Sequence, residues 1–333
     1  MKKYISTVSS LCVRNLTLLT LLMALTIPDV TLAQGDGPRF YWKGLNGTNA
    51  VSVIGSSIGG NANPLDPSYN VIAGSTFEAT ISSPGYARML PVFKRSAMLL
   101  VALPMGRISS DLTLSALNQN TTARGFGDPL IQFGINVIGQ KAIMNIPDML
   151  RYKPGFSVDL ISSLAIPIGE YDNESPINIG QNRWYGRVGA PIVWQIGQWI
   201  PGKRTTFEFV PAVWFFSDNN DFVGKKMETK PMYQLEAHLT RDFMERCWGS
   251  FDIISMSGAT ATIDGVEGNA LNNLGMGLTL GYQLNDNMQL SGSYSSTVND
   301  KGDEDLNMDG FRITLIYGWH ELIEGMARLK GNE

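Results

Sequence analysis

The feature of this sequence that most constrains its fold is an alternation of large apolar residues with small polar ones. Every second residue from Leu274 to Leu284 is large and apolar, and the residues between them are Gly, Thr and Gln. The run from Met288 to Ser295 repeats this pattern after a short turn-like stretch at 284–287. Successive side chains of a strand point to opposite faces, so a period of two predicts strands with two chemically different faces.

The polar face of these strands separates two all-β architectures. The outer face of a soluble sandwich carries many charged side chains, whereas this face carries Gly, Ser, Thr, Asn and Gln. Only 17% of the whole chain is charged, compared with about 25% in an average soluble protein. Small neutral residues suit a wet, enclosed interior, and the large apolar residues suit lipid. The sequence therefore predicts an all-β fold, a transmembrane antiparallel up-and-down β-barrel.

The number of alternating runs predicts the size of the barrel. We expect about twelve strands, at residues 50–58, 70–82, 87–103, 125–138, 154–168, 181–196, 204–216, 229–241, 247–257, 270–283, 288–298 and 310–320. Short connections are expected at 83–86, 197–203, 242–246 and 284–287, and longer ones around 104–124, 169–180, 217–228, 258–269 and 299–309. Short turns of such barrels face the periplasm, so both ends of the barrel are expected there. The long periplasmic connection 139–153 is expected to hold one helical turn beginning near Pro147.

The first residues predict export to the cell outer membrane. Lys2 and Lys3 precede a short apolar run, Leu16–Ile27, and small residues follow at 31–33. This pattern predicts a signal peptide over residues 1–33, cleaved after Ala33. Residues 34–69 form a loop-rich segment that is expected either to plug the barrel or to supply its first strand. The barrel is expected over 70–320, followed by a periplasmic C-terminal tail over 321–333.

Charged residues within the predicted strands are the candidate lumen residues. An Arg or Lys facing lipid at the membrane midplane costs about 2–4 kcal/mol, so charges in strands are expected to face inward. They can pair with one another across the lumen, which we favour, or contact a solute. The candidates are Glu78, Asp159, Arg187, Glu208, Glu236, His238 and Arg312.

A serine motif and a lone histidine suggest chemistry but lack the context that it requires. Gly55–Gly59 matches the G-x-S-x-G serine motif, but no helix is expected after it, so a turn of small residues is favoured. His238 has no second His or Cys at ligand spacing. We therefore predict no catalytic residue, no metal and no cofactor.

The acidic stretch 303–310 matches the start of a calcium-binding loop. The twelfth position of that template requires Glu, and Ile316 stands there instead. We favour a solvated acidic outer loop, and a loose carboxylate site for a divalent ion is the alternative. The formal net charge is −4 and no cluster of Lys and Arg is present, so no nucleic-acid partner is expected.

Several motifs in order along the chain resemble a known family. They are Leu103-Pro104-Met105-Gly106-Arg107, Gly125-Phe126-Gly127-Asp128-Pro129, Pro167-Ile168-Gly169-Glu170-Tyr171-Asp172 and Asn178-Ile179-Gly180-Gln181-Asn182-Arg183-Trp184-Tyr185-Gly186, with further similarity over 231–243 and 277–319. In these residues the chain resembles the meta-pathway of phenol degradation family, a group of outer-membrane transporters. The resemblance implies a barrel and a role near the breakdown of aromatic compounds.

These observations together predict a porin-like channel for the passive uptake of small hydrophobic or aromatic molecules. Two alternatives remain: a structural or surface-binding barrel without transport, and an outer-membrane lipid hydrolase. The expected partners are outer-membrane lipid, the outer-membrane assembly machinery and small hydrophobic or aromatic solutes.

Overall fold

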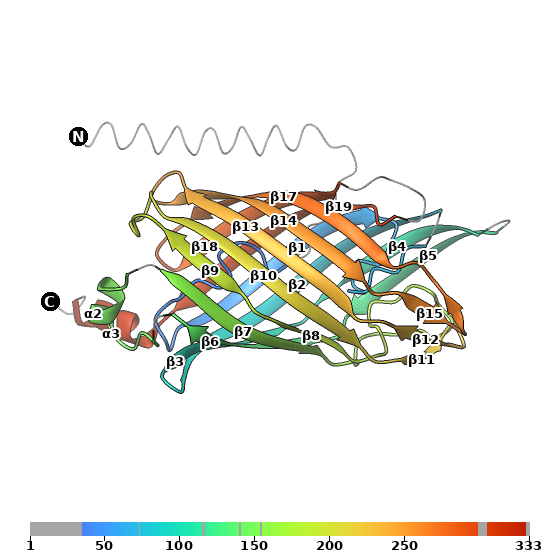
Figure 1. Cartoon of the computed structure of the whole chain (residues 1–333), viewed down its shortest axis with the longest axis horizontal. Coiled ribbons are helices and arrows are strands. Elements are labelled where there is room, and N and C mark those ends of the chain that lie inside the picture. The colour runs from blue at the N-terminus through green and yellow to red at the C-terminus, as the bar shows by residue number, and fades with distance from the viewer. Residues whose placement is uncertain are drawn as a thin grey trace. The chain divides into compact units, whose positions relative to one another are not determined.

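A closed antiparallel β-barrel forms the body of the protein, as the computed structural model in Figure 1 shows. The structure describes residues 35–72, 74–114, 117–139, 141–153, 155–298 and 305–330, and the predicted signal peptide lies outside them. The barrel has twelve strands and closes because β1 pairs with both β19 and β2. In chain order the strands are β1 (Asn49–Gly60), β2 (Ser75–Val92), β3 (Arg95–Ala102) continued by β4 (Met105–Leu114), β5 (Leu117–Phe126) continued by β6 (Leu130–Ile138), β7 (Phe156–Ala165), β8 (Tyr185–Gly189) continued by β9 (Ile192–Ile196), β10 (Thr205–Phe216), β13 (Met232–Asp242), β14 (Cys247–Gly258), β17 (Leu271–Gln283), β18 (Met288–Thr297) and β19 (Met308–Trp319).

The alternation in the sequence corresponds to the two faces of the barrel wall. On β13, Leu235 is 47% exposed on the outside, whereas its neighbours Gln234 and Glu236 are buried inside. Every strand of the wall exposes at least one large apolar or aromatic side chain: Val51, Tyr86, Leu99, Phe133, Leu160, Trp194, Phe207, Leu235, Phe251, Leu278, Leu290 and Leu315. A continuous apolar band of this size requires lipid. The predicted transmembrane barrel of about twelve strands is confirmed.

Prolines interrupt three strands of the wall. Pro104 lies between β3 and β4, Pro129 between β5 and β6, and Pro191 between β8 and β9. Proline has no backbone N–H to donate to the sheet, so the ladder is interrupted and then resumes in the same direction. Each such pair of segments therefore counts as one crossing of the wall.

The predicted turn at 83–86 is wrong. Those residues lie within β2, where Pro84 pairs with Val53 of β1, and the turn is formed by Phe93 and Lys94 at φ 49° and 62°. The Pro-Gly pair at 84–85 indicated a turn, whereas the true turn residues are neither Gly nor Asn and give no such signal. The barrel begins at Asn49, within the segment 34–69 expected either to plug the barrel or to supply its first strand. The predicted loop 104–124 holds the β4–β5 hairpin instead.

The two ends of the barrel carry different structures. At the end with the longer connections, β11 (Asn219–Phe222), β12 (Lys225–Thr229), β15 (Ala261–Ile263) and β16 (Val266–Glu267) form a separate four-stranded sheet. The other end carries two helices, α2 (Ile146–Leu150) and α3 (Glu321–Lys330) (Figure 1). The predicted helical turn is α2, capped by Asn145 and with Pro147 in its first turn. Among the described residues, no helix is both long and apolar enough to cross a membrane.

The lumen is not polar along its whole length, contrary to the expectation from the strand pattern. Apolar side chains fill its outer half, where the segment 61–72 after β1 folds inward and packs Tyr69 against the wall. We call this set the outer apolar cluster; its buried members are Ile58, Ala62, Tyr69, Phe77, Ala79, Ile81, Ile108, Ile177, Ile179, Met232, Ile254, Met256, Ala259, Leu271, Leu306 and Met308. The outer half is thus packed as an ordinary core, and polar groups dominate the inner half.

Candidate functional site

The N-terminal segment of the described chain lies inside the inner half of the lumen. We call residues 35–48, which precede β1, the plug. The plug contacts β7, β8, β10, β13 and β19 through side chains that line the lumen. Gly35 lies so close to β13 that a Cβ there would be 2.3 Å from Oε1 of Glu236, and Gly37 has a φ of +86°. These glycines allow the plug tip to lie against the wall.

Two buried glutamates of the wall hold the backbone of the plug. Glu236 accepts hydrogen bonds from the N–H groups of Asp36 (3.3 Å) and Gly37 (3.1 Å). Glu208 accepts one from the N–H of Arg39 (3.0 Å) and another from Nε1 of Trp42 (3.1 Å). A carboxylate buried in this way needs donors to offset its desolvation. The plug therefore supplies the partners that these two carboxylates require.

Ion pairs between the plug and the wall involve three charged plug side chains. Asp36 pairs with Arg187 of β8 at 2.5 Å, and Arg39 pairs with Asp242 at the end of β13 at 2.7 Å. Lys43 pairs with Asp159 of β7. These pairs lie on different strands, so they hold the plug from several sides of the lumen.

Aromatic packing adds to this polar attachment. Tyr41 is buried against Ile161, Val193 and Val210 of the wall. The guanidinium of Arg39 lies 4.2 Å from the ring centre of Trp42 and 4.3 Å from that of Trp248. Trp248 therefore faces the lumen. It shares its parity with the inward Ser250 and Asp252.

The base of the plug is fixed at the end of the barrel that carries α2 and α3. Leu45 forms a bridge with Ile143, and the N–H of Asn46 donates to the carbonyl of Ile143 at 2.8 Å. Nε2 of His320, just before α3, lies 3.0 Å from the carbonyl oxygen of Asn46. The plug base is thus bonded to the connection between β6 and α2 and to the residue before α3.

His238 occupies the centre of a buried polar chain in the lumen. Its Nε2 lies 2.7 Å from Glu236 and its Nδ1 lies 2.6 Å from Asp252. It thereby orients the carboxylate that receives the plug tip. Ser57 of the G-x-S-x-G motif is exposed on the outside of β1, so the predicted turn there is wrong and the motif lies on the opposite face from His238.

The candidate lumen residues fall into two groups: those that contact or support the plug, and one that faces outward. Asp159, Arg187, Glu208, Glu236 and Arg312 each contact the plug directly, Arg312 through a 3.2 Å bond to the carbonyl of Gly35, and His238 acts through Glu236. The inward placement of Glu78 is wrong: it is exposed, because its neighbours Phe77 and Ala79 face inward. The pairing that we favoured is therefore made largely with the plug.

The plug charges and two wall carboxylates were not among the predicted lumen residues. Asp36, Arg39 and Lys43 lie outside any alternating run, so parity could not place them. Asp242 and Asp252 do follow the inward parity of their strands and could have been found by extending the pattern to the strand end.

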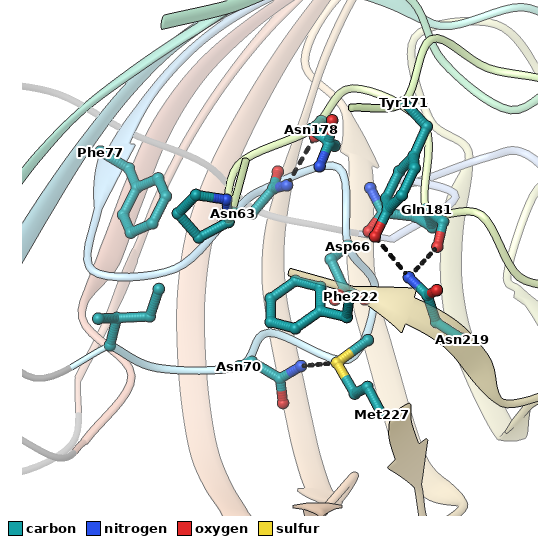
Figure 2. A pocket seen from close by; sticks show the side chains of 12 residues that line it. Asn63, Asp66, Asn70, Phe77, Tyr171, Asn178, Gln181, Asn219, Phe222 and Met227 are labelled. Carbon is teal, nitrogen blue, oxygen red and sulfur yellow. Dashed lines mark hydrogen bonds between the residues drawn. The ribbon is translucent and has the colours of Figure 1, made fainter. Parts of the chain in front are cut away.

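A pocket lies at the outer mouth of the barrel, where Figure 2 shows its side chains. It is formed by the segment 61–72, the loop 169–182 and strands β11 and β12, and its enclosed volume is about 40 Å³. Tyr171 donates from its hydroxyl to the carbonyl of Asp221 at 2.9 Å. Burial raises the pKa of the Tyr171 phenol, so this donor keeps its proton at neutral pH.

The acidic stretch before β19 is only partly described. Asp303 and Glu304 of the possible ion site lie outside the described residues. Within the described part of the chain, no three His, Cys, Asp or Glu side chains are grouped so that they could hold a metal ion. Asn307 instead joins this stretch to the segment 61–72, its N–H donating to Oδ1 of Asn61 at 2.8 Å.

A closed barrel with an apolar outer band, a filled lumen and connections that are longer at one end defines a transmembrane β-barrel of the bacterial outer membrane. The chain belongs to the family described as "Putative MetA-pathway of phenol degradation", whose profile matches residues 56–311. The family resemblance seen in the sequence motifs is thereby confirmed.

Solved structures with a similar fold include an outer membrane channel from Pseudomonas putida F1. It shares 16% identity with this chain at a TM-score of 0.69, covering 86% of this chain and 100% of the channel. The beta domain of the Bordetella autotransporter BrkA shares 9% identity at a TM-score of 0.47, covering 82% of this chain and 100% of that domain. No curated protein matches the chain.

Proposed function

We propose that this protein is an outer-membrane channel for the passive uptake of small hydrophobic or aromatic molecules. The description of its family names phenol degradation, and a protein of similar fold is an outer membrane channel. Uptake would follow the concentration gradient that consumption of the solute inside the cell maintains.

The observation that carries this proposal is the polar attachment of the plug. A barrel of eight strands is filled by its own side chains, whereas barrels of about sixteen strands leave a water channel. With twelve strands this barrel has space to fill, and part of it is occupied by a segment of the chain held through carboxylates and ion pairs. Water can replace each hydrogen bond at a net cost of only about 0.5–1.5 kcal/mol, so displacement of the plug exposes chiefly polar groups and the aromatic side chains of Phe40, Tyr41 and Trp42.

Uptake of a labelled monoaromatic compound by cells tests this proposal. Cells that make the protein are expected to take up the label faster than cells without the gene, with the difference largest at low external concentration. Equal rates in the two strains would contradict the proposal. Conductance in planar bilayers provides a second, independent measurement, because a pore gives discrete current steps.

A second candidate is a structural or surface-binding barrel without transport. The outer apolar cluster and the plug favour it, because together they fill much of the lumen. This candidate predicts no conductance steps at any voltage, for the native chain and for a variant lacking residues 36–43. Steps that appear only in the variant would instead identify the plug as the gate of a channel.

The third alternative, a lipid hydrolase, requires a serine and a base on the same face of the wall. Ser57 and His238 lie on opposite faces. We infer that Ser57 and His238 do not form a catalytic pair, and a purified protein whose lipid hydrolysis was abolished equally by Ser57→Ala and by His238→Ala would overturn this inference.

A further inference from the structure

We propose that two arginines on the outer surface of the barrel bind the phosphate group of a lipid in the outer leaflet of the membrane. We call Arg107 of β4 and Arg124 of β5 the arginine pair, and both side chains are exposed. They lie on the hairpin at the end of the barrel opposite α2 and α3 (Figure 1). The inference does not depend on the proposed channel function, because it concerns the outside of the wall and not the lumen.

The register of the hairpin places the two arginines side by side. Arg107 is the direct antiparallel partner of Arg124, and the Cβ atoms of such partners lie about 4.5–5.5 Å apart. Their neighbours Ile108 and Ala123 belong to or pack against the outer apolar cluster, so the arginines point away from the lumen. Like charges that oppose each other directly destabilise a hairpin. An anion bound between the two guanidinium groups would remove this repulsion.

The arginine pair lies where the outer surface of the wall changes from apolar to polar. One step nearer the middle of the barrel, Met105 is paired with Phe126, which is 51% exposed. At the level of the arginine pair, the register continues from Arg107 to Thr80 of β2 and from there to Ser57 of β1. An arginine on the lipid face is costly at the membrane midplane and tolerated near the interface. This boundary therefore places the arginine pair at the depth of the lipid headgroups.

Two hydroxyl groups lie next to the arginine pair on the same face. Ser109 and Thr122 are paired one step further out along the hairpin, and their Oγ and Oγ1 atoms lie 3.3 Å apart. Residues two apart on a strand share a face. Hydroxyl groups can donate to phosphate oxygens, and the forked guanidinium matches their geometry. Four side chains of the hairpin thus present donors on the same face.

The charges around the arginine pair favour an anion over a cation. Glu78 of β2 lies diagonal to Arg107 in the register, and Asp111 lies two steps further out on β4. Among the described residues, no ion pair joins Glu78 to either arginine. Glu170 lies against the inward side of Gly125, on the face opposite to the arginine pair. Two guanidinium charges therefore face outward beside one neighbouring carboxylate.

The apolar surface below the arginine pair identifies the anion as part of a lipid. An amphiphile whose acyl chains cover Phe126 brings its headgroup to the level of Arg107 and Arg124. Free phosphate would gain nothing from this apolar surface. Lipid A, the phosphorylated glycolipid of bacterial outer membranes, has both the acyl chains and the phosphate groups that the surface fits.

Native mass spectrometry of the purified protein in detergent tests the inference with three probes: lipid A, lipid A without its phosphates, and inorganic phosphate. Lipid A is expected to bind most tightly. The double variant Arg107→Gln with Arg124→Gln is expected to bind it about tenfold more weakly, the value of one hydrogen bond to a charged group. The matched control, Arg151→Gln with Arg246→Gln, removes two exposed arginines at the other end of the barrel and should bind lipid A as the native chain does.

Thermal unfolding followed by circular dichroism provides a second measurement and checks that the variants fold. Lipid A is expected to raise the melting temperature of the native chain and of the control, but not that of the double variant. Without lipid A the double variant should melt no lower than the native chain, because it has lost a repulsion between like charges. Equal binding of lipid A by the native chain and the double variant would overturn the inference. Displacement of lipid A by inorganic phosphate at the same concentration would contradict the choice of a lipid.

Discussion

The attachment of the plug can be tested by removing one charge from it. In Asp36→Asn the side chain keeps its shape but loses the charge that Arg187 faces at 2.5 Å. Arg187 is buried, and its contacts with Oε1 of Gln132 at 3.1 Å and with the ring of Trp214 at 5.3 Å carry no negative charge. The substitution therefore leaves a buried guanidinium without its carboxylate whenever the plug is seated.

The size of the effect follows from the energy of such pairs. Breaking a buried ion pair by removing one partner costs about 3–5 kcal/mol, and we use about 3 kcal/mol because Asp36 retains some exposure and Asn still accepts a hydrogen bond. At about 1.4 kcal/mol for each tenfold change, the population with a displaced plug should rise about 100-fold.

Limited trypsin digestion measures this population directly. The side chains of Arg39 and Lys43 are 7% and 11% exposed in the seated plug, so trypsin cleaves there only when the plug leaves the lumen. The cleavage rate follows the displaced fraction when opening and closing are fast. Cleavage after Arg246, exposed in a short turn, serves as an internal reference.

The matched control for this experiment is Asp218→Asn. Asp218 pairs with Lys226 at 2.8 Å, but both side chains are about half exposed, so the pair contributes little to stability. Cleavage at Arg39 and Lys43 should be unchanged in this variant. An Asp36→Asn protein that trypsin cleaves at these sites as slowly as it cleaves the control would refute the view that ionic contacts hold the plug.

Three further predictions follow. Gly35→Leu should also speed trypsin cleavage of the plug, because its Cβ would lie 2.3 Å from Glu236. Gly44→Leu should not, since nothing lies within 4 Å of a Cβ there. Equal cleavage rates in both variants would contradict the close approach of Gly35 to the wall. Leu235→Arg, on the lipid face of β13, should destabilise the barrel in vesicles by about 2–4 kcal/mol in urea unfolding, whereas Val266→Arg in the outer sheet should have no effect. Asp128→Ala should lower the melting temperature measured by circular dichroism, because Asp128 accepts from the N–H groups of Gly169 (2.9 Å) and Gln181 (2.8 Å). The loss should cost about 1–3 kcal/mol for each N–H group left without an acceptor. An unchanged melting temperature would show that these bonds do not hold the loop 169–182.

The sequence alone determined the wall of the barrel. Residues such as Leu274, Met276 and Leu278 alternate with small residues. Each strand has lipid on one face and an enclosed interior on the other, so the period of two is present within every single strand. For the same reason, parity placed Glu208, Glu236 and His238 in the lumen, because each lies in a long, regular run. It failed for Glu78, whose strand carries apolar side chains inward at its outer end.

Only the tertiary structure decided what fills the lumen. Asp36, Arg39 and Lys43 lie in a segment without period, so nothing local says that they face Arg187, Asp242 and Asp159 from strands more than a hundred residues away. The outer-mouth pocket could not be predicted from the sequence either. Asn70 and Met227 meet only because the segment 61–72 after β1 folds into the mouth of the barrel beside β11 and β12. A strand pattern is set by the solvent on its two faces, whereas the partner of an interior charge is set by how distant segments meet once the barrel has closed.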